Sequence, residues 1–138
     1  MENGCIFKNI IVAGWGKTRH DQEMLTEANG VYVPTPRLQK LNQNYVNTDY
    51  CMSLSPYKWQ YRRLSTKTLL CAQGTVGNSD SCVIDSGGPL MGITASNHVE
   101  IIGIVSHGSL KCDSSRPAIH TRVSKFVPWI AELINGAP

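Results

Sequence analysis

The chain lacks both an apolar run long enough to span a membrane and a strong excess of charge of either sign. Its 138 residues carry a net charge of +3, and only 17% of them are charged. Because this charge is mild and scattered, neither nucleic acid nor a membrane is expected as a partner, and we interpret Arg62-Arg63 as part of a solvated loop. Hydrophobic residues make up 41% of the chain, which predicts a globular fold with a buried core.

Metal-binding cysteine motifs are also missing. The five cysteines are irregularly spaced, with no CxxC pair and no cysteine–histidine cluster, so we expect neither a metal nor a cofactor. Five cysteines in a chain of this size favour an oxidising compartment, and the odd number leaves at least one thiol without an intrachain partner. Yet residues 1–5 do not resemble the start of a signal peptide, and no N-glycosylation sequon supports secretion. One interpretation that reconciles these observations is that the chain is incomplete.

Short β-rich segments separated by turn residues fill most of the chain, with no internal repeat and no low-complexity linker. Asn97 lies between two of these segments, which predicts a hairpin. Residues 17–35 and 108–117 are interpreted as loops, and residues 50–63 as either a single helical turn or a long loop. The segments predicted as strands are 10–16, 37–46, 66–72, 89–94, 99–107 and 118–123.

Residues 124–134 change to helical spacing, with Ser124 as the N-cap and Gly136 after the last turn. One face of this helix carries Val127, Ile130, Ala131 and Ile134. Several short strands followed by one terminal helix predict an all-β antiparallel barrel rather than an alternating β–α fold.

The stretch DSCVIDSGGPL at residues 80–90 places Ser86 between Asp85 and two glycines. Adjacent glycines relax the backbone, so a tight turn here can hold the serine hydroxyl outward with backbone N–H groups beside it. This is the local geometry that an acyl-transfer nucleophile needs. The alternative, which this stretch alone leaves open, is an ordinary surface turn.

Six stretches occur in the order seen in trypsin-like serine proteases, so the chain resembles the chymotrypsin family, most of all the clip-domain proteases of arthropods. The resemblance covers nearly the whole chain from about Ile10 onwards. It implies a six-stranded antiparallel Greek-key barrel followed by a C-terminal helix. Residues 1–138 would then form a partial protease domain whose N-terminal barrel is absent. The stretches are VAGWGKT at 12–18, LCA at 70–72, DSC at 80–82, DSGGPL at 85–90, GIVSHG at 103–108 and TRVSKFVPWI at 121–130.

The resemblance implies a role for each residue of the serine stretch. Ser86 would be the nucleophile, and its N–H and that of Ile84 would form the oxyanion hole. Asp85 would pair with the new N-terminal ammonium after zymogen cleavage. Asp80 would lie at the base of the primary specificity pocket, where a carboxylate favours Lys or Arg side chains of a protein or peptide substrate.

The resemblance also implies the pocket wall. Ser106, His107 and Gly108 would line this wall and pair with an extended peptide substrate by strand addition. Ala118 would lie beside the carboxylate at the base of the pocket.

Four cysteines match family disulfides, which would pair Cys51 with Cys71 and Cys82 with Cys112. Cys5 is then left over, and it is available for a bond to an upstream segment or another chain. An extracellular location is implied by the same resemblance.

The family's other two catalytic residues have no counterpart here. No Ala-Ala-His-Cys type segment, no matching aspartate motif and no activation site of the Ile-Val-Gly-Gly type occur in the sequence. Without a general base a serine hydroxyl is a weak nucleophile, so the isolated chain is expected to be inactive. The four histidines are interpreted as surface or pocket-lining residues rather than as the base: His20, His98, His107 and His120.

Three site positions depart from the family pattern. Ile84 replaces a glycine beside the oxyanion hole, His107 replaces a tryptophan on the pocket wall, and Ala118 replaces a glycine that keeps the pocket open. These changes leave two hypotheses for the chain. It is either part of a serine endopeptidase, or a non-catalytic homologue that acts as a binding module in an extracellular proteolytic cascade.

Overall fold

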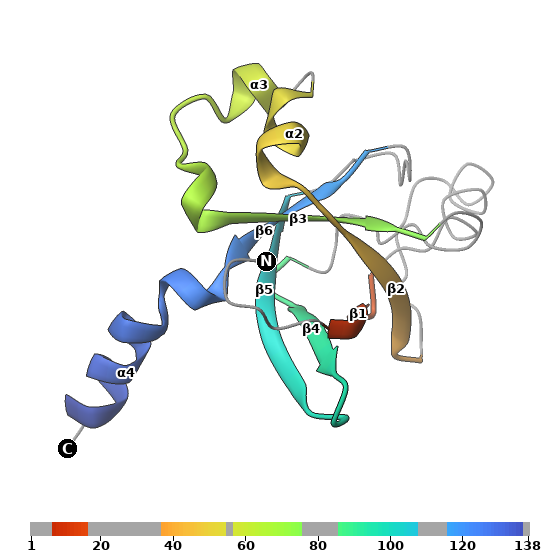
Figure 1. Ribbon diagram of the computed structural model, residues 1–138, viewed down its shortest axis with the longest axis vertical. Coiled ribbons are helices and arrows are strands. Elements are labelled where there is room, and N and C mark those ends of the chain that lie inside the picture. The colour runs from red at the N-terminus through yellow and green to blue at the C-terminus, as the bar shows by residue number, and fades with distance from the viewer. Residues whose placement is uncertain (1–6, 17–36, 55–56, 76–85, 108–115, 137–138) are drawn as a thin grey trace, which may run out of the picture.

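The computed structural model describes residues 7–16, 37–54, 57–75, 86–107 and 116–136 (Figure 1). The strands are β1 (Phe7–Gly14), β2 (Gln39–Val46), β3 (Leu69–Gly74), β4 (Pro89–Thr94), β5 (Val99–His107) and β6 (Ala118–Arg122). The helices are α2 (Thr48–Ser53), α3 (Tyr57–Gln60) and α4 (Val127–Gly136), with 3-10 turns η1 (Thr66–Thr68) and η2 (Val123–Lys125). No helix among these residues combines the length and the apolar character needed to cross a membrane.

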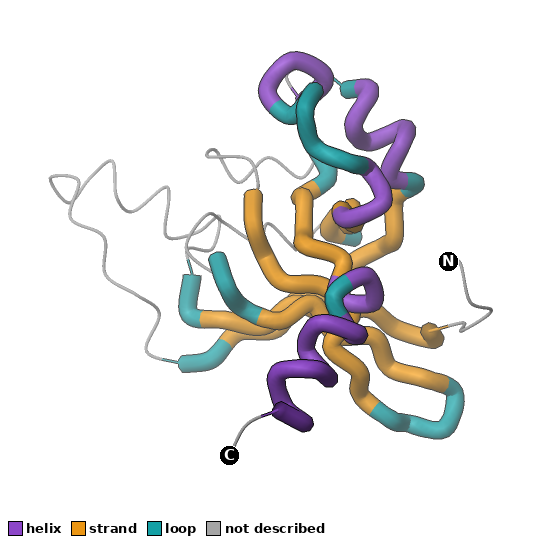
Figure 2. Tube along the Cα trace, turned by 90° about the vertical axis from the view of Figure 1, so that its left-hand side faces the viewer, coloured by secondary structure: helices purple, strands orange, loops and turns teal. Residues whose placement is uncertain are grey.

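The six strands close into one antiparallel barrel in the order β1-β2-β3-β6-β5-β4 (Figure 2). Closure is made by β1, which pairs with β2 on one side and with β4 on the other. The first three strands form a meander, and the last three return so that β6 lies beside β3. This topology confirms the predicted all-β, six-stranded antiparallel barrel with a C-terminal helix.

Strand β3 is buried on both faces, because its apolar residues run continuously instead of alternating with polar ones. Leu70 and Ala72 pack inside the barrel with residues of β1 and β4. Leu69 and Cys71 face outward and pack beneath α2. There the disulfide Cys51–Cys71 joins the helix to the strand, so α2 is covalently held on the barrel wall.

Buried polar side chains, Gln43 and His120 among them, lie with the apolar ones inside the barrel. His120 is 2% exposed and lies between Leu70 of β3 and Val105 of β5 in the strand register. It fits because Gly103 has no side chain: a Cβ added there would lie 3.1 Å from the His120 Cβ. The prediction that His120 is a surface or pocket-lining residue is therefore wrong, because its position on β6 points it into the barrel.

The β4–β5 hairpin follows the predicted bounds of both strands. Its turn places Asn97 in the left-handed region, at φ 64°, which asparagine adopts more readily than most residues. The Asn97 N–H donates to the Thr94 carbonyl at 3.0 Å, and the Thr94 N–H donates to the His98 carbonyl at 2.9 Å. Lys8 of β1 also bonds the Asn97 side chain, which ties the turn to the neighbouring strand.

Several predicted boundaries differ from the structure. Strand β1 covers Phe7–Gly14 instead of residues 10–16, and β2 begins at Gln39 instead of residue 37. Strand β3 begins at Leu69 instead of residue 66, because Thr66–Thr68 form η1 with the Ser65 hydroxyl accepting from the Lys67 N–H. The C-terminal helix begins at Val127, because Val123–Lys125 form η2. An α-helix also begins before residue 50, since the Asn47 side chain caps α2 by accepting from the Tyr50 N–H.

Helix α4 leaves the barrel and points away from it (Figure 1). Its main contact with another element is with η2, the turn that immediately precedes it. All of its residues are exposed. Its large exposed apolar side chains are Val127, Trp129, Ile130, Leu133 and Ile134.

Candidate active site

Ser86 lies in the turn that leads into β4, and its side chain is exposed. The next residue, Gly87, has φ +85°, a conformation that side-chain-bearing residues rarely adopt. Two backbone hydrogen bonds hold this turn against β5: the Gly87 N–H donates to the Val105 carbonyl at 2.8 Å, and the Val105 N–H donates to the Gly88 carbonyl at 2.9 Å. The serine hydroxyl is therefore presented to solvent from a turn that is fixed to the barrel.

The last residues of β5 lie next to the hydrogen bonds between Val105 and the serine turn. Ser106 and His107 follow Val105 directly, and both are exposed. The register shifts between Val105 and His107, and His107 then pairs with Ile119 of β6, next to the half-buried Ala118. The structure thus gathers four of the predicted site residues at one end of the barrel, because the start of β4, the end of β5 and the start of β6 meet there.

Tyr61 reaches the same end of the barrel from the segment after α3. Its ring meets the His107 ring edge-on, with 5.1 Å between centroids and an interplanar angle of 73°. Tyr61 was not among the predicted site residues, because nothing local marks it. Its position depends on how the segment after α3 packs against the end of β5, because His107 lies far from Tyr61 in the sequence.

Several predicted site residues lie outside the described residues, so their roles stay predictions. They are Asp80, Ile84, Asp85 and Gly108 of the predicted site, together with Cys5, Cys82 and Cys112. Of the two disulfides implied by the resemblance, Cys51–Cys71 is present.

No histidine in the described part of the chain is hydrogen-bonded to Ser86, which is the contact that a general base needs. His98 and His107 are exposed. Burial lowers the pKa of His120 from 6.5 to about 4, because the barrel interior disfavours the charged ring. His120 is therefore neutral at pH 7 and enclosed away from the exposed serine. The described residues contain no group of three or more side chains that could hold a metal ion.

A closed antiparallel barrel that presents an exposed serine from a glycine turn, beside the end of a neighbouring strand, is the arrangement expected of a trypsin-like serine protease domain. The Trypsin family matches residues 7–130, and the chain belongs to this family.

Three similar proteins come from arthropods. Phenoloxidase-activating factor 3 of Holotrichia diomphalia is 35% identical over 136 residues, which cover 97% of this chain and 34% of that protein. The CLIP domain-containing serine protease HP8 of Bombyx mori is 36% identical over 121 residues, covering 86% of this chain and 29% of that protein. The clotting factor G beta subunit of Tachypleus tridentatus is 28% identical over 128 residues, covering 92% of this chain and 39% of that protein. The chain thus spans between 29% and 39% of the length of these relatives.

Proposed function

We propose that the chain is the C-terminal barrel of a trypsin-like serine endopeptidase, in which Ser86 attacks the peptide carbonyl and forms the acyl-enzyme. The observation that carries this proposal is the exposed Ser86 in a turn whose Gly87 has φ +85° and is hydrogen-bonded to Val105. A rigid turn of this kind supports a nucleophile because it positions the hydroxyl without further reorganisation.

In this proposal, the remaining site residues act as the resemblance implies. The N–H groups of Ser86 and Ile84 stabilise the oxyanion, Asp85 accepts the activated N-terminus, and Asp80 at the pocket base attracts a basic side chain. Ser106 and His107 lie exposed at the end of β5, where an extended protein substrate could pair with the strand.

We propose that a preceding barrel supplies the general base. Helix α4 supports this proposal, because it exposes an apolar surface that a single globular unit would normally bury. Cys5 offers a covalent link to that unit or to another chain. The names of two relatives, a phenoloxidase-activating factor and a clotting factor subunit, support a place in an extracellular proteolytic cascade.

A non-catalytic homologue is the second candidate, favoured by the pocket wall. The His107 ring is in edge contact with Tyr61, and Ala118 adds a methyl group where the family pattern has glycine. Together with Ile84 beside the oxyanion hole, these residues would narrow the pocket and weaken transition-state binding. In this case the barrel would bind a protein of the cascade without cleaving it.

An active-site organophosphate probe separates the two candidates. The 138-residue chain alone should not be labelled, because no base activates Ser86. The same chain, expressed with the segment encoded upstream of it, should be labelled stoichiometrically if it is an endopeptidase, and Ser86→Ala should abolish the labelling. Absence of labelling in a folded longer protein would favour the homologue, and labelling that persists in Ser86→Ala would contradict both.

A further inference from the structure

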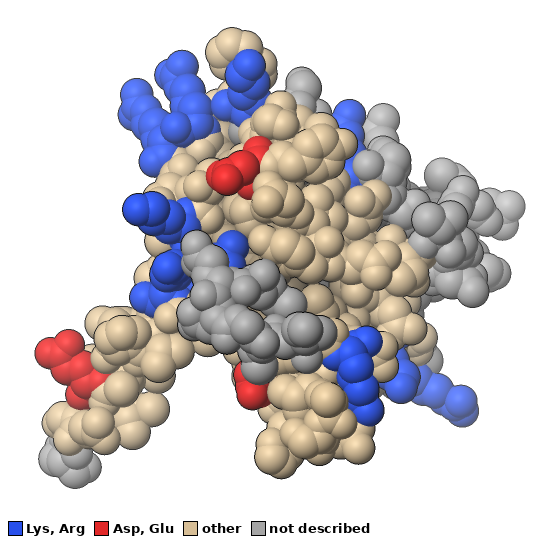
Figure 3. Space-filling view, viewed as in Figure 1, with Lys and Arg blue, Asp and Glu red and all other residues tan. Residues whose placement is uncertain are grey.

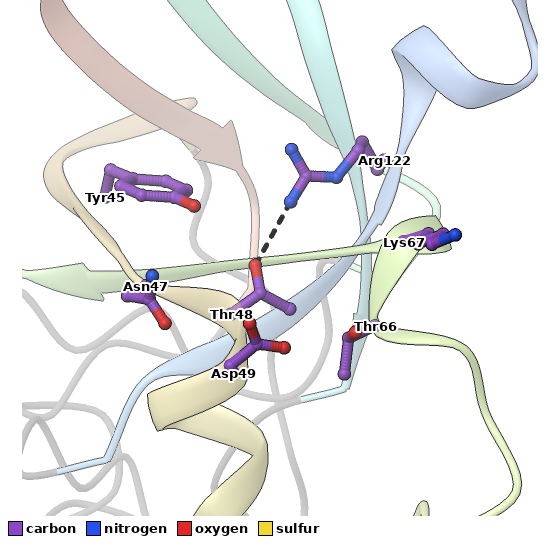
Figure 4. A pocket seen from close by; sticks show the side chains of 7 residues that line it. All are labelled: Tyr45, Asn47, Thr48, Asp49, Thr66, Lys67 and Arg122. Carbon is purple, nitrogen blue, oxygen red and sulfur yellow. Dashed lines mark hydrogen bonds between the residues drawn. The ribbon is translucent and has the colours of Figure 1, made fainter. Parts of the chain in front are cut away.

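A pocket of about 510 Å³ lies beside Arg122 (Figure 4). Arg122 ends β6, and Ala118 of the candidate active site begins it. The pocket forms where the end of β2, the start of α2, η1 and the end of β6 come together. Its lining is polar and carries two cationic side chains and one anionic one: Tyr45, Asn47, Thr48, Asp49, Thr66, Lys67 and Arg122.

Arg122 is the unusual member of this lining, because it is a charged residue that is only 9% exposed. Its Nε donates to the Leu69 carbonyl at 2.9 Å, and its Nη2 donates to Thr48 Oγ1 at 3.1 Å. A guanidinium group has five N–H donors, so these two bonds leave three for other acceptors. Among the described residues no carboxylate pairs with Arg122, although a buried charge is stabilised mainly by such a partner.

Thr48 and Tyr45 add hydroxyl donors to the pocket. The Thr48 oxygen already accepts the Arg122 bond, so its own proton is available to donate elsewhere. In Figure 4 the hydroxyl end of Tyr45 points toward the Arg122–Thr48 pair. These side chains therefore offer several donors that suit a negatively charged acceptor with several oxygen atoms.

The basic residues near the pocket in the sequence also favour a negatively charged ligand. No acidic residue occurs between residues 50 and 79, whereas this segment contains Lys58, Arg62, Arg63 and Lys67. Basic side chains gather over α3, the turn after it and η1 on the face shown in Figure 3. Arg62 and Arg63 are exposed, in agreement with the solvated loop that the sequence suggested, and of the four basic residues in this segment Lys67 lines the pocket.

Asp49 is the one lining residue that opposes an anion. Its exposed side chain lies on the far side of Thr48 from Arg122 (Figure 4). It also lies in the first turn of α2, where a carboxylate is favoured by the helix dipole. Asp49 therefore has a structural reason to be there, and removing its charge should strengthen anion binding.

We propose that this pocket binds a tetrahedral oxyanion group, a sulfate or a phosphate, on Arg122, Thr48 and Lys67. The group could be a free ion or the sulfate ester of an acidic oligosaccharide, and both present the same oxygen atoms to the guanidinium. The site is separate from the serine turn, so it does not depend on whether the chain is catalytic.

The test measures thermal unfolding of the 138-residue chain in sodium sulfate and in sodium chloride of equal ionic strength. Sulfate should raise the unfolding temperature saturably, because a ligand that binds only the native state stabilises it. Asp49→Asn should lower the sulfate Kd about twofold to fivefold, as expected for removal of one nearby exposed charge. Lys67→Ala should raise it by a similar factor, whereas Lys40→Ala removes the same charge at the other end of β2 and should leave it unchanged.

Arg122→Gln should raise the Kd about tenfold or more, since it removes the charged donors. Because this variant also loses the buried bond to Leu69 and with it part of the stability of the fold, the Asp49 and Lys67 variants decide the outcome independently. A heparin-derived sulfated oligosaccharide forms the second arm: if it binds with the same variant pattern while free sulfate does not, the group is carried on a chain. The proposal is overturned if neither ligand binds, or if Lys40→Ala weakens binding as much as Lys67→Ala.

Discussion

The barrel and helix α4 differ in how they use their apolar residues. In the barrel, side chains such as Leu90 of β4 and Leu70 of β3 converge from strands on opposite sides and are sealed by closure of the sheet. In α4, residues of the same kind, Leu133 among them, face outward. The barrel therefore contains its own stabilising contacts, whereas α4 presents surface that requires a partner. The difference suggests that stability and association reside in separate parts of this chain.

Two Leu→Ala substitutions give the largest expected contrast. Leu90 is 0% exposed in the barrel core, and Leu133 is 56% exposed on α4. Leu90→Ala should lower the free energy of unfolding by about 2–5 kcal/mol, because it removes buried surface and leaves a cavity. Leu133→Ala removes the same atoms and should change it by less than about 0.5 kcal/mol. Urea unfolding of both variants measures the contrast, and equal losses would show that α4 packs on the barrel.

The barrel interior should also make stability depend on pH. In the unfolded chain the pKa of His120 returns to 6.5, whereas burial holds it at about 4 in the folded chain. Between these values the unfolded state binds a proton that the native state does not, so the free energy of unfolding falls as the pH falls, by about 3 kcal/mol in all. Unfolding curves from pH 7 to pH 4 measure this slope. His120→Leu should flatten it and His98→Gln should not; an unchanged slope in His120→Leu would contradict the assignment.

The smallest effect on stability, with a clear effect on association, is expected at α4. The isolated chain should self-associate through this helix, because its exposed apolar side chains gain from burial. The double variant Trp129→Gln and Leu133→Gln should reduce association in sedimentation velocity and leave the unfolding free energy nearly unchanged. The matched control is Val99→Gln with Ile101→Gln, which removes exposed apolar groups from β5. Sedimentation of the wild-type chain as a monodisperse monomer would contradict this prediction.

Local patterns were sufficient to predict much of the fold. The β4–β5 hairpin is fixed by apolar segments on both sides of Asn97, so its bounds followed from neighbouring residues alone. Strand β3 was predicted to begin three residues early, because Thr66–Thr68 have strand-like side chains while the Ser65 hydroxyl closes a 3-10 turn. Short capped turns of this kind depend on single hydrogen bonds, which apolar spacing does not record.

Side chains that depend on distant contacts could not be predicted in the same way. Arg122 reaches Thr48, 74 residues earlier in the chain, and Tyr61 reaches His107 from a segment interpreted only as a helical turn or loop. His120 was interpreted as a surface or pocket-lining residue, because the space left by Gly103 appears only when β5 and β6 pair. At the candidate site, the motif around Ser86 was sufficient to predict an exposed turn. The hydrogen bonds that hold this turn to β5 are visible only in the structure.

Closure of the barrel affects how this chain can aggregate. Open sheets present unpaired N–H and C=O groups along their edges, and these groups recruit further strands into fibrils. Here each of the six described strands has a neighbour on both sides, so this barrel offers no edge for such growth. Contacts between folded copies should therefore be made by side chains and remain reversible, and irreversible fibrils would have to begin from chains in which the pairing of β1 with β4 has opened.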